Sequence, residues 1–389
     1  MATTSSGSLG ALAGLRVLDL GRILSAPLCA RVLADLGARV IKVEAITGDD
    51  SRSFGPFYEG QSSYFRLFNR NKYGISLDLK TEEGRETLTS LIERSDVVIE
   101  NFRTGAFDRL GFPPDRLLEI NPRIIIASIS GFGRETPLEG QPAYDLIVQA
   151  LSGLMSVTGP EGGDGVRVGI SIGDIVPSLY AAVAILAALE ERRTTGRGQH
   201  IDISMLDGII SVLESIAMKA LYTDDELRPT GTHQAVSAPY GTFKTADDHI
   251  AIAIANDSLF ARLAKVLDHP EWITDPRYAS DSTRGVNRHE LQVDIEFALS
   301  GQSAQDATRS LESAGIPCSP VLTVREALAH PHTEAREMLV QEADGFTTLA
   351  NGFHIRGSRD TFAAAPTLGQ HNDMLETWLS EPPRVASQA

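Results

Sequence analysis

The stretch LRVLDLGRILSAPLCARVLADLGARVIKVE, residues 15–44, decides the fold of this chain. It begins with LRVLDLG and ends with RVIKVE, two short runs rich in leucine, isoleucine and valine that are typical of buried strands. Between them, APLCARVLADLGA has helical spacing, with Ser25 as the expected N-cap and Gly37 near the expected end. The order strand, helix, strand predicts two parallel strands that are joined by a helical crossover.

The same alternation continues through the first 200 residues. In chain order the further segments are ISLDL (strand), TEEGRETLTSLIERS (helix, capped by Thr81), DVVIENF (strand), DRLLEINP (helix) and RIIIASISGFG (strand). Strands that are apolar on both faces need cover on both faces. We therefore expect an α/β fold in which a parallel sheet lies between helices.

The length of 389 residues exceeds the roughly 250–300 residues that one hydrophobic core serves, so we expect two domains. The large domain is assigned to residues 1–200 and is completed by residues 321–389. Residues 201–224 are expected to form a long linker helix that follows a strand. A smaller α+β domain is assigned to residues 225–320, because PYGTFKTADDHIAIAIAND predicts an antiparallel hairpin and amphipathic helices follow it.

The formal net charge of −16 disfavours nucleic acid or an anionic membrane surface as the main partner. Cys29 and Cys318 lie in apolar sequence without the spacing of a metal site, which predicts free thiols, no bound metal and a reducing compartment. The first residues do not resemble a signal peptide, and the longest apolar run, residues 175–189, is shorter than the ~18–20 residues of a membrane span. We expect a cytoplasmic protein without a membrane partner.

One carboxylate stands immediately before a long apolar helix. In GISIGDIVPSLYAAVAILAALEERR, residues 169–193, Asp174 precedes the predicted helix, and Pro177 fits the first turn of that helix. An aspartate in this place is expected to be an N-cap, which stabilises a helix by about 1 kcal/mol. The field at a helix N-terminus also keeps a carboxylate ionised, and Gly173 leaves room for a ligand, so the same position suits a nucleophile. The pattern alone does not separate the two roles.

Two glycine-containing motifs suggest other chemistry. GFGRET, residues 131–136, starts like a dinucleotide fingerprint but lacks the third glycine and a following helix, which disfavours a nicotinamide cofactor. GISIG, residues 169–173, fits the elbow of serine hydrolases, with Ser171 as the nucleophile. That elbow needs a helix directly after the serine, whereas the helix here is predicted to begin three residues later. A serine hydrolase remains an alternative, because aspartates and histidines follow downstream.

Further blocks run in order along nearly the whole chain: NRNKYGISLDLKTEEGRE, DVVIENFRTGAFDRLGF, NPRIIIASISGFG, AYDLIVQALSGLMSVTGP, GDIVPSLYAAVAILAALEERRTTGRGQHIDISMLD, PYGTFKTADD and LGQH. In these blocks and in residues 15–44 the chain resembles the family III CoA transferases, the group that includes formyl-CoA transferase, carnitine-linked CoA transferases and the 2-methylacyl-CoA racemases. NRNK, GLMSVTGP and PYGTFKT are most similar to the succinyl-CoA–dicarboxylate transferases. The resemblance implies a Rossmann-like large domain and an interlocked homodimer, with the connector around residues 204–221 as the linker.

The resemblance also implies a nucleophile. In this family the nucleophilic aspartate follows a glycine at the start of a long apolar helix, twenty-nine residues after an acidic residue in a Y-E or H-D pair. Here Tyr144–Asp145 is the pair, and Asp174 lies twenty-nine residues beyond Asp145. Asp174 is thus expected to attack an acyl-CoA thioester, with Tyr144, Asp145 and Gln149 around it. A mixed anhydride and then an aspartyl-CoA thioester would follow, without ATP, metal or a tightly bound cofactor, because CoA and acyl-CoA are the substrates.

The implied reaction moves CoA from an acyl-CoA donor, most simply succinyl-CoA, to a small carboxylic or dicarboxylic acid. A 2-methylacyl-CoA racemase is the alternative within the family. Racemases carry a histidine and a glutamate at positions that are Tyr144 and Lys244 here, which weakens a two-base proton exchange. A non-catalytic CoA-binding relative is disfavoured by the intact Asp174.

The resemblance assigns CoA contacts to Ser25, Ala26, Asn71, Lys72, Asn101, Phe102, Ala106 and Arg109. Among them, Lys72 and Arg109 could pair with phosphates, and Phe102 offers an apolar face. The chain departs from formyl-CoA transferases at two positions, because Ala45 replaces an arginine and Pro142 replaces a lysine. We therefore expect the 3′-phosphate to be held differently.

The acceptor acid is the least defined part of the prediction. A dicarboxylate needs a cation for its spare carboxylate, and Arg70 in NRNK is the expected residue. The loop RPTGTHQAVSAPY offers His233 and Gln234 as further substrate contacts. The sequence does not name the donor or the acceptor.

Overall fold

The computed structural model of the protein describes residues 10–234, 237–355 and 362–383. These residues divide into two compact units. The first unit comprises the chain up to Leu154, Arg167–Asp224 and the chain from His332 onward, and the second comprises Met155–Val166 and Asp225–Pro331. Residues 155–166 and 321–331 therefore belong to the second unit, whereas the sequence assigned them to the large domain.

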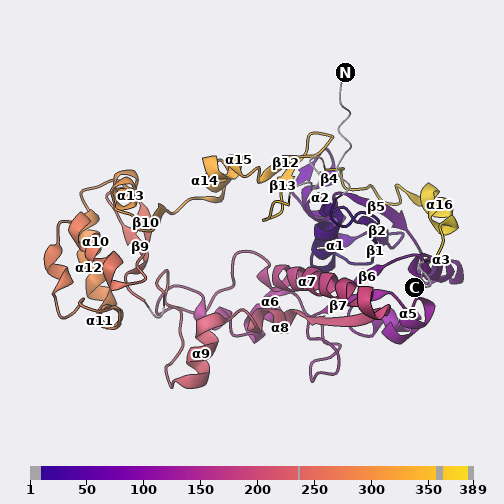
Figure 1. Ribbon diagram of the computed structural model, residues 1–389, viewed down its shortest axis with the longest axis horizontal. Coiled ribbons are helices and arrows are strands. Elements are labelled where there is room, and N and C mark those ends of the chain that lie inside the picture. Colours follow the sequence, from indigo (N-terminus) through magenta and orange to yellow (C-terminus); the bar gives the residue numbers. More distant parts are fainter. Residues whose placement is uncertain (1–9, 235–236, 356–361, 384–389) are drawn as a thin grey trace. The chain divides into compact units, whose positions relative to one another are not determined.

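A six-stranded sheet forms the centre of the first unit (Figure 1). In spatial order its strands are β5 (Lys72–Ser76), β2 (Arg39–Glu44), β1 (Arg16–Asp19), β6 (Val97–Glu100), β7 (Ile125–Ser130) and β8 (Gln199–Ser204). All neighbouring strands pair in parallel. The predicted α/β fold with a parallel sheet is confirmed.

Helices cover both faces of this sheet. On one face α1 (Ser25–Asp35) and α7 (Ile172–Thr195) share a core with β6 and β7 through Leu33, Ile185 and Ile99. On the other face Leu88, Leu117 and Trp378 pack against the same strands. These come from α3 (Glu82–Glu93), α5 (Pro114–Ile120) and α16 (Leu375–Ser380).

Shorter elements complete the first unit. They are η1 (Asp50–Ser53), β3 (Phe57–Tyr58), β4 (Gln61–Ser62), α2 (Ser63–Asn69), α4 (Ala106–Arg109), α6 (Asp145–Leu151), β12 (Leu339–Gln341), β13 (Thr347–Leu349) and η4 (Asn372–Met374), while α15 (Pro331–Ala335) begins at the boundary between the units.

The helix caps test the local sequence reasoning. Thr81 caps α3 as predicted, because its side chain accepts the Gly84 N–H. The prediction for Ser25 is wrong: it is the first residue of α1, and its hydroxyl accepts a hydrogen bond from Asn101 instead of capping the helix.

The connector after the sheet is not one long helix. Residues 201–224 contain the end of β8, then α8 (Met205–Ile210) and α9 (Glu214–Tyr222). The expected linker helix is interrupted because Glu214 adopts a left-handed backbone conformation, with φ of 56°.

α7 is longer than its sequence pattern predicted. It spans 24 residues, and by length and composition it is the one helix in the described part of the chain that could cross a membrane. However, Ala181, Ile185 and Ala188 of this helix are buried in the core beside the sheet. The apolar segment is therefore, at least in part, a core helix of the first unit.

The second unit contains a three-stranded antiparallel sheet in the order β11 (Cys318–Pro320), β10 (His249–Ala253) and β9 (Tyr240–Lys244). The predicted hairpin is confirmed by the antiparallel pairing of β9 with β10. The other elements are η2 (Met155–Val157), α10 (Asp257–Val266), η3 (Pro270–Ile273), α11 (Asp281–Val286), α12 (Arg288–Leu299), α13 (Ala304–Ser313) and α14 (Val324–Leu328).

The order of the six strands creates a crevice. The chain proceeds from β1 outward to β2 and β5 on one side, and later to β6, β7 and β8 on the other. In such sheets the crossovers next to the point of reversal run on opposite faces, which leaves space outside the carboxyl ends of the strands. We therefore looked for the site at the carboxyl ends of β1 and β6.

Candidate active site

Asp174 is the third residue of α7, not its N-cap. The helix begins at Ile172, and Ser171 occupies the N-cap position without a side-chain capping bond. Pro177 accordingly lies inside the helix and not in its first turn. Gly173 packs closely against Asp145, since a Cβ there would lie 3.0 Å from Oδ1 of Asp145. The structure thus gives this glycine a packing role that the sequence did not predict.

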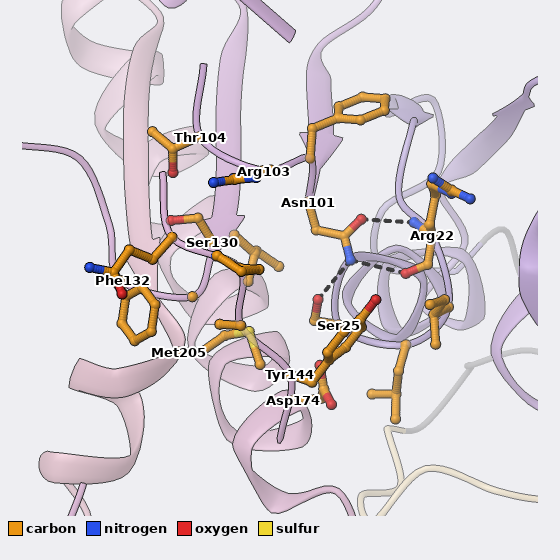
Figure 2. Close-up of a pocket in the computed structure, with 18 of the residues that line it drawn as sticks. Arg22, Ser25, Asn101, Arg103, Thr104, Ser130, Phe132, Tyr144, Asp174 and Met205 are labelled. Atoms are coloured by element: carbon orange, nitrogen blue, oxygen red, sulfur yellow. Dashed lines mark hydrogen bonds between the residues drawn. The ribbon is translucent and has the colours of Figure 1, made fainter. Parts of the chain in front are cut away.

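Asp174 opens into a cavity of about 340 Å³ at the carboxyl edge of the sheet (Figure 2). The wall combines the loops after β1, β6 and β7 with the residues that precede α6. Its polar side chains include Arg22, Ser25, Asn101, Arg103, Ser130 and Tyr144. Tyr144, at the N-cap position of α6, is 72% exposed in this chain.

The carboxylate of Asp174 has no hydrogen-bond partner among the residues that the structure describes. Burial, with a further contribution from the charge of Asp145, raises the pKa of Asp174 to about 7. This corrects the sequence argument, which relied on the helix N-terminus to keep the group ionised. A desolvated carboxylate with free oxygens is poised for proton exchange or for nucleophilic attack.

Asp145 and Gln149 lie behind Asp174 in a buried hydrogen-bond network. Asp145, the first residue of α6, accepts bonds from the Gly173 N–H at 2.9 Å and from the amide of Gln149 at 2.8 and 2.9 Å. Gln149 is fully buried, and its carbonyl oxygen accepts the Val168 N–H at 2.8 Å. Both residues hold the start of α7 and do not line the cavity.

Asn101 fixes the loop after β1. Its side-chain oxygen accepts the Arg22 N–H at 2.8 Å, and its amide group donates to the Arg22 carbonyl and to the Ser25 hydroxyl, both at 2.9 Å. Ser25 can therefore donate its own proton toward the cavity. The backbone N–H groups of Ser25 and Ala26, at the start of α1, donate to none of the described residues. They leave a partial positive charge at this wall.

A second cavity of about 360 Å³ adjoins the first. It lies at the carboxyl ends of β1, β2 and β5, and Arg22 and Phe102 line both cavities. Ala45, Lys80 and Leu110 are among its other lining residues. Phe102 also stacks on Phe107 of α4, with ring centroids 5.4 Å apart.

Three predicted ligand contacts are instead parts of the buried framework. The ammonium of Lys72 bonds Asp19 at 2.7 Å, and burial lowers the pKa of Lys72 to about 8. Arg70 is fully buried and pairs with Asp35 at 2.7 Å. Asn71 donates to Asp35 at 2.7 Å as well. None of these three side chains reaches either cavity, so their assignment to CoA or to the acceptor does not fit the structure.

The remaining predicted residues have mixed placements. Ala106 and Arg109 are the first and last residues of α4 and line neither cavity, although the next residue, Leu110, lines the second. Ala26 is fully buried and contributes only its backbone. His233 and Gln234 belong to the second unit, so their role stays a prediction.

The sequence analysis missed Arg22, Arg103 and Arg167. Arg103 follows Asn101 and Phe102 at the end of a buried strand. Polar residues at the carboxyl ends of parallel strands often contact ligands, so this position could have predicted Arg103 as a site residue. Arg167 pairs with Asp145 at 3.1 Å from a segment without regular structure, and no pattern marks it.

The serine-hydrolase motif fails in the structure, for a different reason than expected. The helix does begin directly after Ser171, but no strand ends there; the residues before it are turns and coil. Within the described residues, the Ser171 side chain has no hydrogen bond to a histidine or a carboxylate.

Together, the fold and the site define an α/β protein with a cavity at the carboxyl edge of a parallel sheet, next to a carboxylate that has no partner among the described residues. The chain belongs to CoA-transferase family III, whose model matches residues 12–372. It is 39% identical to the acetyl-CoA:oxalate CoA-transferase of Acetobacter aceti, covering 98% of each chain. It is 38% identical to the succinyl-CoA:mesaconate CoA-transferase of Haloarcula hispanica, covering 85% of each.

Among solved structures, a CAIB/BAIF family protein from Brucella suis is similar, with 35% sequence identity and a TM-score of 0.85. The match covers 95% of this chain and 100% of that one. The protein is therefore an enzyme that transfers CoA, and CoA thioesters are its substrates.

Proposed function

We propose that this enzyme moves CoA from succinyl-CoA to a small carboxylic or dicarboxylic acid, with Asp174 as the covalent nucleophile. The observation that carries this proposal is the unpaired, desolvated carboxylate of Asp174 in the cavity of a family III CoA-transferase. A carboxylate without donors has all of its lone pairs available, and loss of water strengthens it as a nucleophile.

The proposed reaction conserves the energy of the thioester. An oxygen of Asp174 bonds to the thioester carbon of the donor, and the C–S bond breaks. CoA thiolate departs, and a mixed anhydride between Asp174 and the donor acid remains. The thiolate then attacks the aspartyl carbon, the donor acid departs, and an aspartyl-CoA thioester remains. The acceptor carboxylate attacks this thioester and repeats the two steps in reverse, which regenerates Asp174. Each bond broken is replaced by one of similar energy, provided that water is kept out.

Each step passes through an oxyanion that needs hydrogen-bond donors. The N–H groups of Ser25 and Ala26 and the Ser25 hydroxyl are unpaired donors at the wall of the same cavity. The positive end of α1 adds to their effect. We therefore assign oxyanion stabilisation to the start of α1, and the positioning of α7 to Asp145 and Gln149.

The two adjoining cavities suit the two ends of CoA. The thioester end belongs beside Asp174, and the nucleotide end belongs in the second cavity, whose lining includes Lys80. Lys80 takes the phosphate role that Lys72 cannot fill, since Lys72 is paired inside the framework. Ala45 lines this second cavity, which is consistent with a changed grip on the 3′-phosphate.

The acceptor requires a cation near Asp174 if it is a dicarboxylate. The Nε of Arg103 donates to the Gly140 carbonyl, whereas its terminal nitrogens bond to no described residue. Arg22 is already paired with Asp50, so Arg103 is the cation of the first cavity with free donors. We assign the spare carboxylate to Arg103 in place of Arg70. The names of the relatives, which include oxalate and mesaconate as acceptors, support a dicarboxylate.

A homodimer is part of the proposal. Leu179, Tyr180, Val183 and Leu186 form an apolar face of α7 that is 38–63% exposed in the single chain. A continuous apolar face of this kind fits a second copy of the chain, and the family resemblance implies an interlocked pair. Light scattering after size-exclusion chromatography is expected to give twice the mass of 41.9 kDa.

Hydroxylamine trapping tests the nucleophile. It is expected to inactivate the enzyme only in the presence of acyl-CoA and to modify Asp174, which peptide mass spectrometry locates. Asp174→Asn is expected to abolish CoA transfer and labelling. Asp207→Asn is the matched control, because Asp207 is also the third residue of a helix, α8, but is exposed. Modification of another residue in the wild type would refute the role of Asp174.

The acceptor assignment and the alternatives need separate assays. Arg103→Ala is expected to raise the KM of a dicarboxylate acceptor about tenfold or more and to leave that of a monocarboxylate nearly unchanged. Exchange of the α-hydrogen of a 2-methylacyl-CoA with deuterated water, without an acceptor, would instead establish a racemase. Labelling of Ser171 by a fluorophosphonate would establish a hydrolase.

A further inference from the structure

A row of polar side chains crosses three strands beneath the active-site loops. Glu100 of β6, Ser128 of β7 and Asp202 of β8 are direct neighbours in the parallel register. His200 lies two residues before Asp202 and therefore on the same face. The opposite face of these strands packs into the core through residues such as Ile99. The row ends at the carboxyl edge of the sheet, where both cavities lie.

Glu100 is the end of this row that lies next to the active-site loops. Its side chain is buried, and its carboxylate accepts the Phe102 N–H at 2.7 Å. The hydroxyl of Ser128, the cross-strand neighbour of Glu100, favours its ionised form. The oxygen of Ser128 lies 3.0 Å from Nε2 of His200. Within the described residues, Glu100 has no direct ion pair.

The charges around this row come from α4, α5, β8 and the loop after β7. Arg134 pairs with Asp108 of α4 at 2.9 Å and favours the ionised form of Glu100, while Asp108 opposes it. Burial outweighs both and raises the pKa of Glu100 to about 7. Burial and Arg134 lower the pKa of His200, against the opposing charges of Asp202, Asp108 and Asp115. Near neutral pH, Glu100 gains or loses a proton while His200 stays neutral.

The amide that Glu100 holds belongs to the loop shared by the two cavities. Asn101, Phe102, Arg103 and Thr104 all line the first cavity, and Phe102 lines the second as well. The same loop fixes the Arg22 backbone through Asn101. A change at Glu100 therefore reaches the walls of both cavities through one peptide N–H.

We propose that Glu100 is a positioning residue that responds to protons: as a carboxylate it fixes the Phe102 amide and holds loop 101–104 in the shape that binds acyl-CoA. When Glu100 takes a proton from solvent, the carboxylate that the Phe102 amide faces becomes a neutral acid. The neutral acid is a weaker acceptor, and the Phe102 amide is held less firmly.

Hydrogen–deuterium exchange of the ligand-free enzyme tests the first part directly. After correction for the intrinsic exchange rate, the Phe102 amide is expected to be about fivefold more protected at pH 8 than at pH 6. Glu100→Gln is expected to remove this difference and to hold protection at the level of pH 6. Ser128→Ala removes a donor that stabilises the carboxylate, so the midpoint of the change should move to higher pH. A purely structural role of Ser128 would not move it.

The matched control is Glu139→Gln. Glu139 also accepts a backbone N–H, that of Glu135 at 3.1 Å, but it is exposed. This variant is expected to keep the pH dependence at Phe102. Persistence of that dependence in Glu100→Gln, or an unmoved midpoint in Ser128→Ala, would overturn the proposal.

The consequence for acyl-CoA rests on the proposed function. In the wild type, the acyl-CoA KM is expected to be about fivefold higher at pH 6 than at pH 8. In Glu100→Gln, the KM is expected to equal the wild-type value at pH 6 over the whole pH range. The kcat profile, which Asp174 controls, should be the same in both enzymes. If hydroxylamine trapping fails while the exchange results hold, the proposed function is wrong and the Glu100 assignment stands. An acyl-CoA KM that varies with pH equally in both enzymes refutes the effect on substrate binding.

Discussion

Asp174→Asn is expected to stabilise the first unit at pH 8 while it abolishes CoA transfer. Burial raises the pKa of Asp174 to about 7 in the folded protein, from an ordinary value of 3.8. Between these two pH values the folded state binds a proton that the unfolded state has already lost. The free energy of unfolding therefore falls as pH rises through this range, and the loss is complete above about pH 7. The variant has no charge to bury and avoids this loss.

The size of the effect follows from the shift. About three pKa units at about 1.36 kcal/mol each give an upper limit of roughly 4 kcal/mol. Residual contact with water and the field of α7 reduce this value, and the new amide without a partner costs about 1–3 kcal/mol. We expect a net gain of about 1–2 kcal/mol at pH 8, which vanishes or changes sign near pH 4.

Urea unfolding followed by tryptophan fluorescence can measure this gain in the correct unit. Trp378 is buried in the first unit and Trp272 in the second, so a Trp272→Phe background leaves the signal of the first unit. Asp207→Asn serves as the contrast, because an exposed aspartate in a first helical turn is stabilising, and its loss should cost about 0.3–1 kcal/mol. If Asp174→Asn lowered stability at pH 8, or raised it equally at every pH, the desolvation argument would be refuted.

Three further predictions concern the nucleophile, the buried Lys72 and the two cysteines. In Glu100→Gln, whose acyl-CoA KM is expected not to vary with pH, kcat/KM for the donor is expected to rise nearly tenfold per pH unit below pH 7 and to level off above it, since only ionised Asp174 attacks; a flat profile between pH 5.5 and 7 would contradict the pKa of about 7. Lys72→Met is expected to lower the free energy of unfolding by about 3–5 kcal/mol, because Asp19 loses its partner. The acyl-CoA KM of the folded fraction is expected to stay nearly unchanged. A large rise in that KM would show that Lys72 binds a phosphate of CoA after all. Burial raises the pKa of the Cys29 thiol. A thiol reagent is therefore expected to modify Cys318 in the native protein and Cys29 only after unfolding. Mass spectrometry of the labelled peptides shows which cysteine reacts first.

The parallel sheet could be predicted from the sequence because its signal is local. A strand that is covered on both faces must be apolar throughout, and residues 15–44 carry two such runs around a helix. The connector could not be predicted in the same way. Its apolar residues continue through Glu214, and only the backbone conformation of that residue divides α8 from α9.

The candidate nucleophile was predicted through the family resemblance, whereas its surroundings were not. Arg70 and Lys72 are cations in a polar stretch, and in a linear sequence they resemble ligands for carboxylates or phosphates. Their partners, Asp35 and Asp19, are 35 and 53 residues away in sequence. Pairing over such distances depends on how α1 and the strands β1, β2 and β5 come together in the sheet, which no short pattern encodes. Arg103 was missed although it follows a buried strand, and the sequence does not show that its terminal nitrogens are left without a partner among the described residues.

Two carboxylates with a pKa of about 7 lie at the same edge of the sheet, and their different positions in the fold suit them to different roles. Glu100 ends a strand, so its backbone continues into a loop, and its carboxylate accepts the N–H of Phe102 in that loop. Asp174 begins a helix whose first N–H groups are satisfied by Ser171 and Asp145, so its oxygens face the cavity without partners. Protonation of Asp174 therefore removes the nucleophile and changes kcat, whereas protonation of Glu100 loosens a cavity wall and changes KM. Because the two groups titrate in the same range, only variants that remove one of them at a time can separate the two effects.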